Sequence, residues 1–145
     1  RPIPLLVATS RDERALRRTG RYGDGWITTT PNAADFQAQL PVIEQSAREA
    51  GRSFEGAPKG LYATFHLDAD GERARADGPG HVAAYFRSPG GGGENSPFFG
   101  SPKDIAQRLQ GYVDAGLTMV IVRLVDPDIS KQADLLHETA ALLRR

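Results

Sequence analysis

Short apolar runs alternate with longer stretches in which apolar residues recur every three or four positions. Four runs read as strands, at Ile3–Ala8, Trp26–Thr29, Leu61–Leu67 and Met119–Val125. Continuous apolar runs of this length are typical of strands that are buried on both faces of a parallel sheet. The stretches between them have the periodicity of amphipathic helices.

Two helix starts carry clear capping signals. Ser10 opens the sequence SRDE, in which a serine followed three residues later by Glu13 predicts a helix that continues to about Arg21 and turns Tyr22 inward. Ser101 precedes a proline and an acidic residue, which predicts a second helix that Gly116 ends. We expect the inward face of this helix to comprise Ile105, Leu109, Tyr112 and Val113.

The remaining helical patterns are less regular. Asp35–Ala50 predicts a helix that Pro41 kinks or starts late, and a last helix is expected from about Lys131. Residues 68–99 are rich in glycine and proline, so that only a short helix at Val82–Phe86 is predicted there. The leucines expected to face inward from the last helix are Leu135, Leu136, Leu142 and Leu143.

This order of elements is about four βα units. Alternating strands and helices of this kind predict an α/β fold with parallel strands, and four units are half of an eight-unit TIM barrel. Half of a barrel has two open sheet edges, which need covering. The chain also begins with Arg1 in place of methionine. We therefore expect residues 1–145 to be one partial barrel domain whose N-terminal half is absent.

Composition narrows the function classes. The 145 residues are 39% hydrophobic and 25% charged with a formal net charge of zero, which does not favour a nucleic-acid or membrane partner. Cysteine is absent, which excludes disulfides and thiolate chemistry, and a cytoplasmic location is the default expectation. His66, His81 and His137 are isolated along the sequence, so no metal site is predicted. His66 is expected to be buried with its hydrogen bonds satisfied.

Three segments together carry a family resemblance. PIPLLVATS, RALRRTGRYGDGWITT and FGSPKDIAQRLQGYVDAGLTMVIVRL, in this order, resemble the C-terminal half of the bacterial luciferase-like monooxygenase family. That family contains FMN-dependent monooxygenases and deazaflavin (F420)-dependent oxidoreductases built on a TIM barrel. The spacing of GRYGDGWITT is most similar to the branch with F420-dependent glucose-6-phosphate dehydrogenases.

The resemblance implies an oxidoreductase fragment that uses F420 for hydride transfer or FMN for monooxygenation of a small organic substrate. It leaves the choice of cofactor open. It also leaves the catalytic acid and base unknown, because the family places many of the residues that handle protons in the other half of the barrel.

The resemblance also implies a cofactor site at the first strand-to-helix junction. Ala8, Thr9 and Ser10 stand where the family usually has glycines that meet the cofactor phosphate, and Arg14 lies one turn further on. Unpaired N–H groups at a helix start favour an anion. The alternative is that Ser10 is only an N-cap, since two acidic residues in the first turn oppose an anion.

Residues of the second strand are assigned to the substrate. Thr29 matches a substrate-contacting threonine of the F420 sugar-phosphate enzymes, and Trp26 and Thr28 precede it. Trp26 has core packing as its alternative interpretation. Asn32 stands where those enzymes have a phosphate-binding lysine, which argues against a phosphorylated sugar as substrate.

Three further features keep two interpretations each. Arg123 interrupts an apolar strand, which indicates either a ligand contact or a structural ion pair. The glycine-rich run at 88–100 is either a loop over the barrel mouth or a disordered insertion. The whole chain is either part of an enzyme or a non-catalytic half-barrel, which would assemble with a second copy of itself or with a complementing N-terminal half-barrel.

Overall fold

The computed structural model describes residues 3–88 and 97–143, and most of the glycine-rich run lies outside these ranges. The chain divides into two compact units. Unit 1 comprises Arg1–Tyr62 and Tyr112–Ile121, and unit 2 comprises Ala63–Gly111 and Val122–Arg145. The two units are described separately below.

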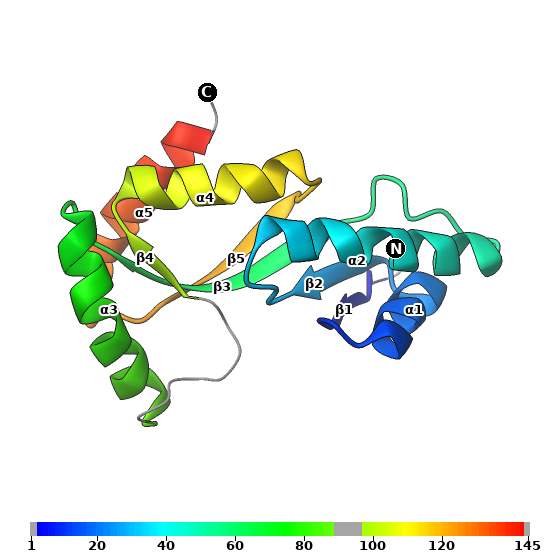
Figure 1. Cartoon of the computed structure of the whole chain (residues 1–145), viewed down its shortest axis with the longest axis horizontal. Helices are drawn as coiled ribbons and strands as arrows, with labels where there is room; N and C mark the ends of the chain where they lie inside the picture. The colour runs from blue at the N-terminus through cyan, green and yellow to red at the C-terminus, as the bar shows by residue number, and fades with distance from the viewer. Residues whose placement is uncertain (1–2, 89–96, 144–145) are drawn as a thin grey trace. The chain divides into compact units, whose positions relative to one another are not determined.

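Strands and helices alternate throughout the described chain (Figure 1). The three pairings with a printed register, β1–β2, β2–β3 and β3–β4, are parallel, and β5 pairs with β3. In chain order the elements are β1 (Leu6–Ala8), α1 (Glu13–Tyr22), β2 (Gly25–Thr28), α2 (Ala33–Glu49), β3 (Lys59–Leu67), α3 (Gly71–Phe86), β4 (Phe98–Gly100), α4 (Pro102–Asp114), β5 (Met119–Leu124) and α5 (Ile129–Leu143).

Aromatic side chains form the core of unit 1. Trp26 of β2 stacks on Phe36 of α2 with ring centroids 5.0 Å apart, and Phe36 meets Tyr112 edge-on at 5.9 Å. Helices α1 and α2 lie side by side (Figure 1), and a Cβ atom at Gly20 would collide with the carbonyl oxygen of Ile43. Glycine at position 20 is therefore required for the two helix backbones to approach this closely.

Helix α2 differs from its prediction. Asn32 is its N-cap and accepts a 2.8 Å hydrogen bond from the Asp35 N–H, and the helix then continues through Pro41 without ending there. The predicted late start at Pro41 was wrong, because capping by Asn32 and burial of Phe36 begin the helix two turns earlier.

Unit 2 contains two elements that the sequence did not predict at their full extent. Helix α3 has 16 residues where a short helix was expected, and Asp70 caps it through the N–H groups of Glu72 and Arg73. Strand β4 was not predicted. Its Phe98 stacks on Phe65 at 5.0 Å, and its register places Phe99 beside His66.

The start of α4 confirms the capping prediction. The Ser101 hydroxyl accepts from the Asp104 N–H at 3.3 Å, and the Asp104 carboxylate accepts from the Ser101 N–H at 3.1 Å. Gly116 has φ +98 after the helix, as its predicted terminating role requires. Val113 was expected to face inward but is 44% exposed.

Several predicted core residues lie at the surface. Strand β1 is shorter than the expected Ile3–Ala8, and its Leu6 is 36% exposed; Leu5, just before the strand, is 64% exposed. It pairs with β2, and no other described strand pairs with it, so one edge stays uncovered. Tyr22 and Leu142 are also exposed, contrary to expectation.

Among the helices of the described residues, none has the length and apolarity needed to cross a membrane.

Candidate functional site

The carboxyl ends of β1 and β2 meet in unit 1, and we call Thr9, Ser10, Thr28 and Thr29 there the β1–β2 junction. The Ser10 Oγ atom lies 2.9 Å from Thr28 Oγ1 and 3.2 Å from Thr29 Oγ1, and it accepts from the Thr29 N–H at 3.1 Å. Thr9 donates its N–H to the Ile27 carbonyl at 2.9 Å. The structure thus brings together two predicted cofactor residues and two predicted substrate residues.

Burial separates the predicted substrate residues. Trp26 and Thr28 point to one face of β2, because side chains alternate along a strand, whereas Thr29 follows the end of the strand. Trp26 and Thr28 are buried, with 0% and 1% exposure. Trp26 stacks on Phe36 of α2, and its indole N–H donates to the Thr9 carbonyl at 2.9 Å. Thr29 is partly exposed and is the predicted substrate residue whose side chain is accessible in this structure.

The helix start differs from the capping prediction. Asp12, and not Ser10, is the N-cap of α1, and its carboxylate accepts from the Ala15 N–H at 2.8 Å. Arg11 adopts φ +59 just before it, which displaces the helix start by two residues. Ser10 is thereby free to bind the threonines of β2, and the predicted Ser10 cap was wrong.

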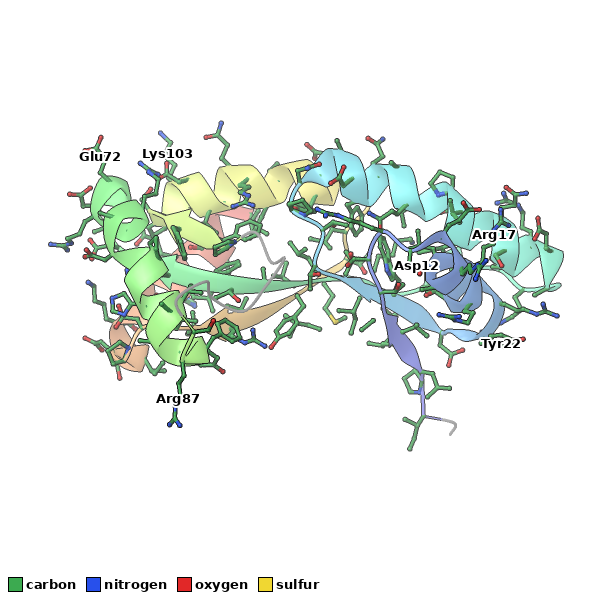
Figure 2. The ribbon with its side chains drawn as sticks, turned by 60° about the horizontal axis from the view of Figure 1, so that its bottom comes forward. Asp12, Arg17, Tyr22, Glu72, Arg87 and Lys103 are labelled. Atoms are coloured by element: carbon green, nitrogen blue, oxygen red, sulfur yellow. The ribbon has the colours of Figure 1, made fainter. Side chains whose placement is uncertain are left out.

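Arg14 is exposed on the first turn of α1. It lines a shallow surface depression together with Asp12, Glu13 and Arg17, of which Asp12 and Arg17 are labelled in Figure 2. Arg17 pairs with Glu13 at 2.9 Å, whereas no ion pair of Arg14 is found among the described residues. Arg14 therefore offers its charge to a ligand without breaking a described ion pair.

Polar residues of unit 2 gather beyond the ends of β3 and β5. Asp68 is buried and binds Arg73 at 2.6 Å and Lys131 at 2.7 Å, and these hydrogen bonds hold the pKa of Asp68 well below its ordinary value. Asp68 is thus an ionised carboxylate whose charge two cations balance, which is a structural role.

Arg123 places its guanidinium 4.9 Å from the Phe86 ring centroid and 5.6 Å from that of Tyr85, a cation–π arrangement that the sequence did not suggest.

Sequence reasoning missed a second polar cluster in unit 2. His66, His81 and Asp126 each bring one ligand-type atom within 4.8 Å of the others. The three residues lie 15 and 45 positions apart in the chain, and no spacing motif links them. Their proximity depends on α3, the helix whose full length was not predicted.

Parallel strands alternating with helices, with polar groups at the carboxyl ends of β1 and β2, are the architecture of part of an α/β barrel. The sequence model of the luciferase-like monooxygenase family matches residues 1–95. The chain belongs to this family, which confirms the predicted resemblance.

Two curated relatives share part of the sequence. A 5,10-methylenetetrahydromethanopterin reductase of Methanopyrus kandleri is 36% identical over 59 residues, covering 41% of this chain and 17% of the reductase. An F420-dependent glucose-6-phosphate dehydrogenase of Gordonia bronchialis is 33% identical over 75 residues, covering 50% of this chain and 22% of that enzyme. The aligned regions are thus about a fifth of the length of these relatives.

Solved structures share the fold at low sequence identity. An F420-dependent secondary alcohol dehydrogenase in complex with an F420–acetone adduct superposes with a TM-score of 0.77 at 15% identity, over 100% of this chain and 50% of that chain. A coenzyme F420-dependent tetrahydromethanopterin reductase from Methanopyrus kandleri gives 0.69 at 22% identity, over 92% and 49%. The chain therefore spans about half of these folds, which confirms the predicted half of a TIM barrel.

Proposed function

We propose that the chain forms part of an oxidoreductase that binds F420 or FMN beside the β1–β2 junction and acts on a small organic substrate. The observation that carries the proposal is the convergence of Thr9, Ser10 and Thr29 at the carboxyl ends of two parallel strands, the edge where barrel enzymes place their sites. When bound, the cofactor ring supplies the redox chemistry, and the protein supplies position and phosphate contacts.

The groups around the start of α1 fit a phosphate. The N–H groups of Glu13 and Arg14 are in the first helical turn, where no intrahelical acceptor exists. The Arg14 guanidinium adds a positive charge, and Ala8 and Thr9 lead into the turn. The charges of Asp12 and Glu13 oppose an anion, although Glu13 pairs with Arg17 at 2.9 Å and Asp12 accepts from the Ala15 N–H. We assign the phosphate to Thr9 and Arg14, with Ala8 lining the approach.

Ser10 has a different task in this proposal. A hydroxyl has one proton, and Ser10 Oγ lies within hydrogen-bonding distance of two threonine hydroxyls while it accepts from a backbone N–H. Donation to a phosphate would break one of these bonds. We therefore infer that Ser10 positions Thr29 and that Thr29 faces the substrate.

The substrate proposed here carries no sugar phosphate. The resemblance to the F420 sugar-phosphate enzymes implies that they have a lysine at the place of Asn32. The Asn32 side chain accepts from the Asp35 N–H at 2.8 Å and donates to the Asp35 carboxylate at 3.2 Å. An amide used in this way to cap α2 has no charge for a phosphate dianion.

F420 is the favoured cofactor, and hydride transfer is the favoured reaction. The relatives above 30% identity include two glucose-6-phosphate dehydrogenases named as F420-dependent and a 5,10-methylenetetrahydromethanopterin reductase. A tetrahydromethanopterin reductase among the solved structures is named as F420-dependent. FMN-dependent monooxygenation is the second possibility, and the two cofactors share the phosphate that the proposed site would hold.

A fluorescence titration with F420 and, separately, FMN tests this proposal. Arg14→Ala is compared with Arg18→Ala, a second exposed arginine of the same helix, so that both variants lose the same charge. A hydrogen bond to a charged group contributes about 1.5–3 kcal/mol, so Arg14→Ala should weaken binding roughly 10- to 100-fold. Arg18→Ala should leave binding within about twofold of the unmodified chain, because only a weak surface charge is lost.

The titration has three informative outcomes for the proposed cofactor site. Saturable binding that weakens in Arg14→Ala alone supports the site. Binding that is equally affected by both arginines contradicts the assignment to Arg14 and indicates a general charge effect. No binding of either cofactor by a chain with a cooperative thermal transition excludes a cofactor site in this chain by itself.

A second candidate function rests on the exposed β1. The side chains of Ile3, Leu5 and Leu6 present apolar surface beside an unpaired strand edge. We propose that a second copy or a complementing half-barrel covers this edge, with or without catalysis. Light scattering tests self-association: Leu5→Asp should shift a dimer to a monomer, and a monomeric unmodified chain contradicts pairing with itself.

A further inference from the structure

We propose that His66, His81 and Asp126 of unit 2 bind a divalent transition metal, of which Zn²⁺ suits the ligands best. Two imidazoles and one carboxylate are a ligand set that zinc accepts, with one position left for water or another ligand. None of the three residues belongs to the cofactor and substrate residues proposed above, which lie in unit 1.

The buried histidine supplies the strongest observation. His66 is 4% exposed at the end of β3, and its Nδ1 atom has no hydrogen-bond partner. A buried polar atom that is left without a partner costs about 1–3 kcal/mol, so its retention calls for an explanation. The Oδ2 atom of Asp126 lies 3.3 Å from Nδ1, but the two atoms form no hydrogen bond. A cation held between the two atoms would supply the partner that His66 Nδ1 lacks.

The distances match the size of a metal site. Two ligand atoms held tetrahedrally at about 2.0–2.1 Å from zinc are roughly 3.3 Å apart. The separation of His66 Nδ1 and Asp126 Oδ2 is 3.3 Å, and His81 Nε2 lies 3.9 Å from the same oxygen. His81 must therefore move at least about 0.6 Å closer to this oxygen to complete the same geometry.

Binding also requires one ring to turn. The His66 and His81 rings are stacked with centroids 4.4 Å apart and planes 26° apart, whereas a metal lies near the plane of each imidazole that binds it. His66 is fixed in the core, but the His81 side chain is 30% exposed on α3. We expect His81 to rotate about its side-chain bonds when the metal binds, while His66 and Asp126 stay in place.

Neighbouring groups already orient the carboxylate. Asp126 Oδ1 accepts from the Asp128 N–H at 2.7 Å, and Asp126 Oδ2 accepts from the Gln132 amide at 3.3 Å. Gln132 is itself fixed, because its amide makes two 2.8 Å hydrogen bonds to the backbone of Leu67. Outer partners of this kind hold metal ligands in place. Burial, together with His81, lowers the pKa of His66, which favours the neutral imidazole that metals require.

The first test is a titration of the metal-free chain, without a histidine tag, with Co²⁺ and then Zn²⁺. Co²⁺ with mixed nitrogen and oxygen ligands gives visible absorption bands, and zinc should displace it at one equivalent. His81→Ala and Asp126→Asn remove one ligand each, and Asp126→Asn keeps an oxygen to accept from the Asp128 N–H. His137→Ala is the matched control, because His137 is exposed on α5 outside the cluster.

We expect one-to-one binding that both ligand variants weaken by more than the 10- to 100-fold typical of an outer partner. His137→Ala should bind as the unmodified chain does. Binding that survives both ligand variants, or that His137→Ala reduces equally, overturns the proposal. So does the absence of binding by a chain shown by circular dichroism to be folded.

A second measurement needs no variant. Nitrogen NMR of the unmodified chain reports each imidazole nitrogen, and zinc should shift Nδ1 of His66 and Nε2 of His81 while leaving His137 unchanged. Unshifted His66 and His81 signals at saturating zinc contradict the site even if the variants fail to fold. A shift of Nδ1 on protonation alone, with no effect of zinc, identifies instead a His66–Asp126 pair without a metal.

Discussion

Substitutions at two glycines of α3, Gly78 and Gly80, can measure the energetic cost of a steric contact between α3 and β4. Gly78 faces Phe99 of β4, and a Cβ atom there would lie 2.6–2.8 Å from three atoms of the Phe99 ring. Gly80 is two residues further along the same helix, and a Cβ atom there would meet nothing within 4 Å. Replacing each glycine by alanine adds the same methyl group to the same helix in two different surroundings.

The expected magnitudes follow from these surroundings. Alanine is favoured over glycine in a helix interior by about 1 kcal/mol, so Gly80→Ala should stabilise the chain by roughly that amount. At position 78 the same gain is offset, because Phe99 must withdraw by about 0.8 Å to reach ordinary contact, and overpacking of this kind costs about 1–3 kcal/mol. Gly78 also directly precedes Pro79, and a Cβ atom before a proline is disfavoured in a helix. The difference between the two variants is therefore at least the contact cost of about 1–3 kcal/mol.

Urea denaturation followed by circular dichroism measures the difference in the free energy of unfolding, and thermal denaturation measures it as a difference in melting temperature. For a chain of this size, 1 kcal/mol corresponds to about 2–4 °C in the melting temperature, so Gly78→Ala should melt roughly 2–12 °C below Gly80→Ala. Two variants of equal stability would show that α3 does not pack on Phe99 through Gly78. A Gly78→Ala more stable than Gly80→Ala would refute the reasoning altogether.

Three further substitutions test individual contacts. Gln132→Ala leaves the buried N–H and C=O groups of Leu67 without partners and should lower the free energy of unfolding by about 2–4 kcal/mol in urea; a loss below about 1 kcal/mol contradicts this role. The pKa of Asp68 is held below its ordinary value of 3.8, so its contribution is complete above that pH and is lost as the pH falls below it; Asp68→Asn should flatten the acid side of the stability profile, and an unchanged profile contradicts the ion pairs. Trp26→Phe keeps an aromatic ring but loses the indole hydrogen bond to the Thr9 carbonyl, and thermal denaturation should show a loss of about 1–2 kcal/mol.

Much of the fold could be predicted from local pattern. Both confirmed features at α4, the Ser101–Asp104 capping box and the glycine at 116, depend on residues within one or two turns of each other. Four of the five described strands, β1, β2, β3 and β5, were located because their apolar runs are bounded by turn residues. These signals are local, so a sequence carries them without knowledge of the tertiary contacts.

Helix α3 could not be predicted because its stability comes from packing. Its 16 residues include Gly71, Gly78, Pro79 and Gly80, a composition that disfavours an isolated helix. In the structure, Gly78 favours the packing of α3 on β4, because the absence of a side chain leaves room for the Phe99 ring. Intrinsic preference is a weak guide where a tertiary contact of this kind is available.

The β1–β2 junction shows the same division between local and distant causes. The SRDE pattern correctly predicts a helix start near Ser10, but Ser10 and Asp12 compete for the N-cap position there. Asp12 takes it, because Ser10 finds better partners in Thr28 and Thr29, 18 and 19 residues away. That competition is decided by strand pairing, which the capping pattern does not include.

The competition at the helix start has a consequence for function. A serine that capped α1 would aim its hydroxyl at the first-turn N–H groups and compete with a phosphate for them. With Asp12 bound to the Ala15 N–H, the N–H groups of Glu13 and Arg14 stay open, and Ser10 is used to fix Thr29. The displaced cap therefore separates two tasks that the sequence pattern had assigned to one residue, so that replacing Ser10 by alanine should alter substrate contacts more than cofactor affinity.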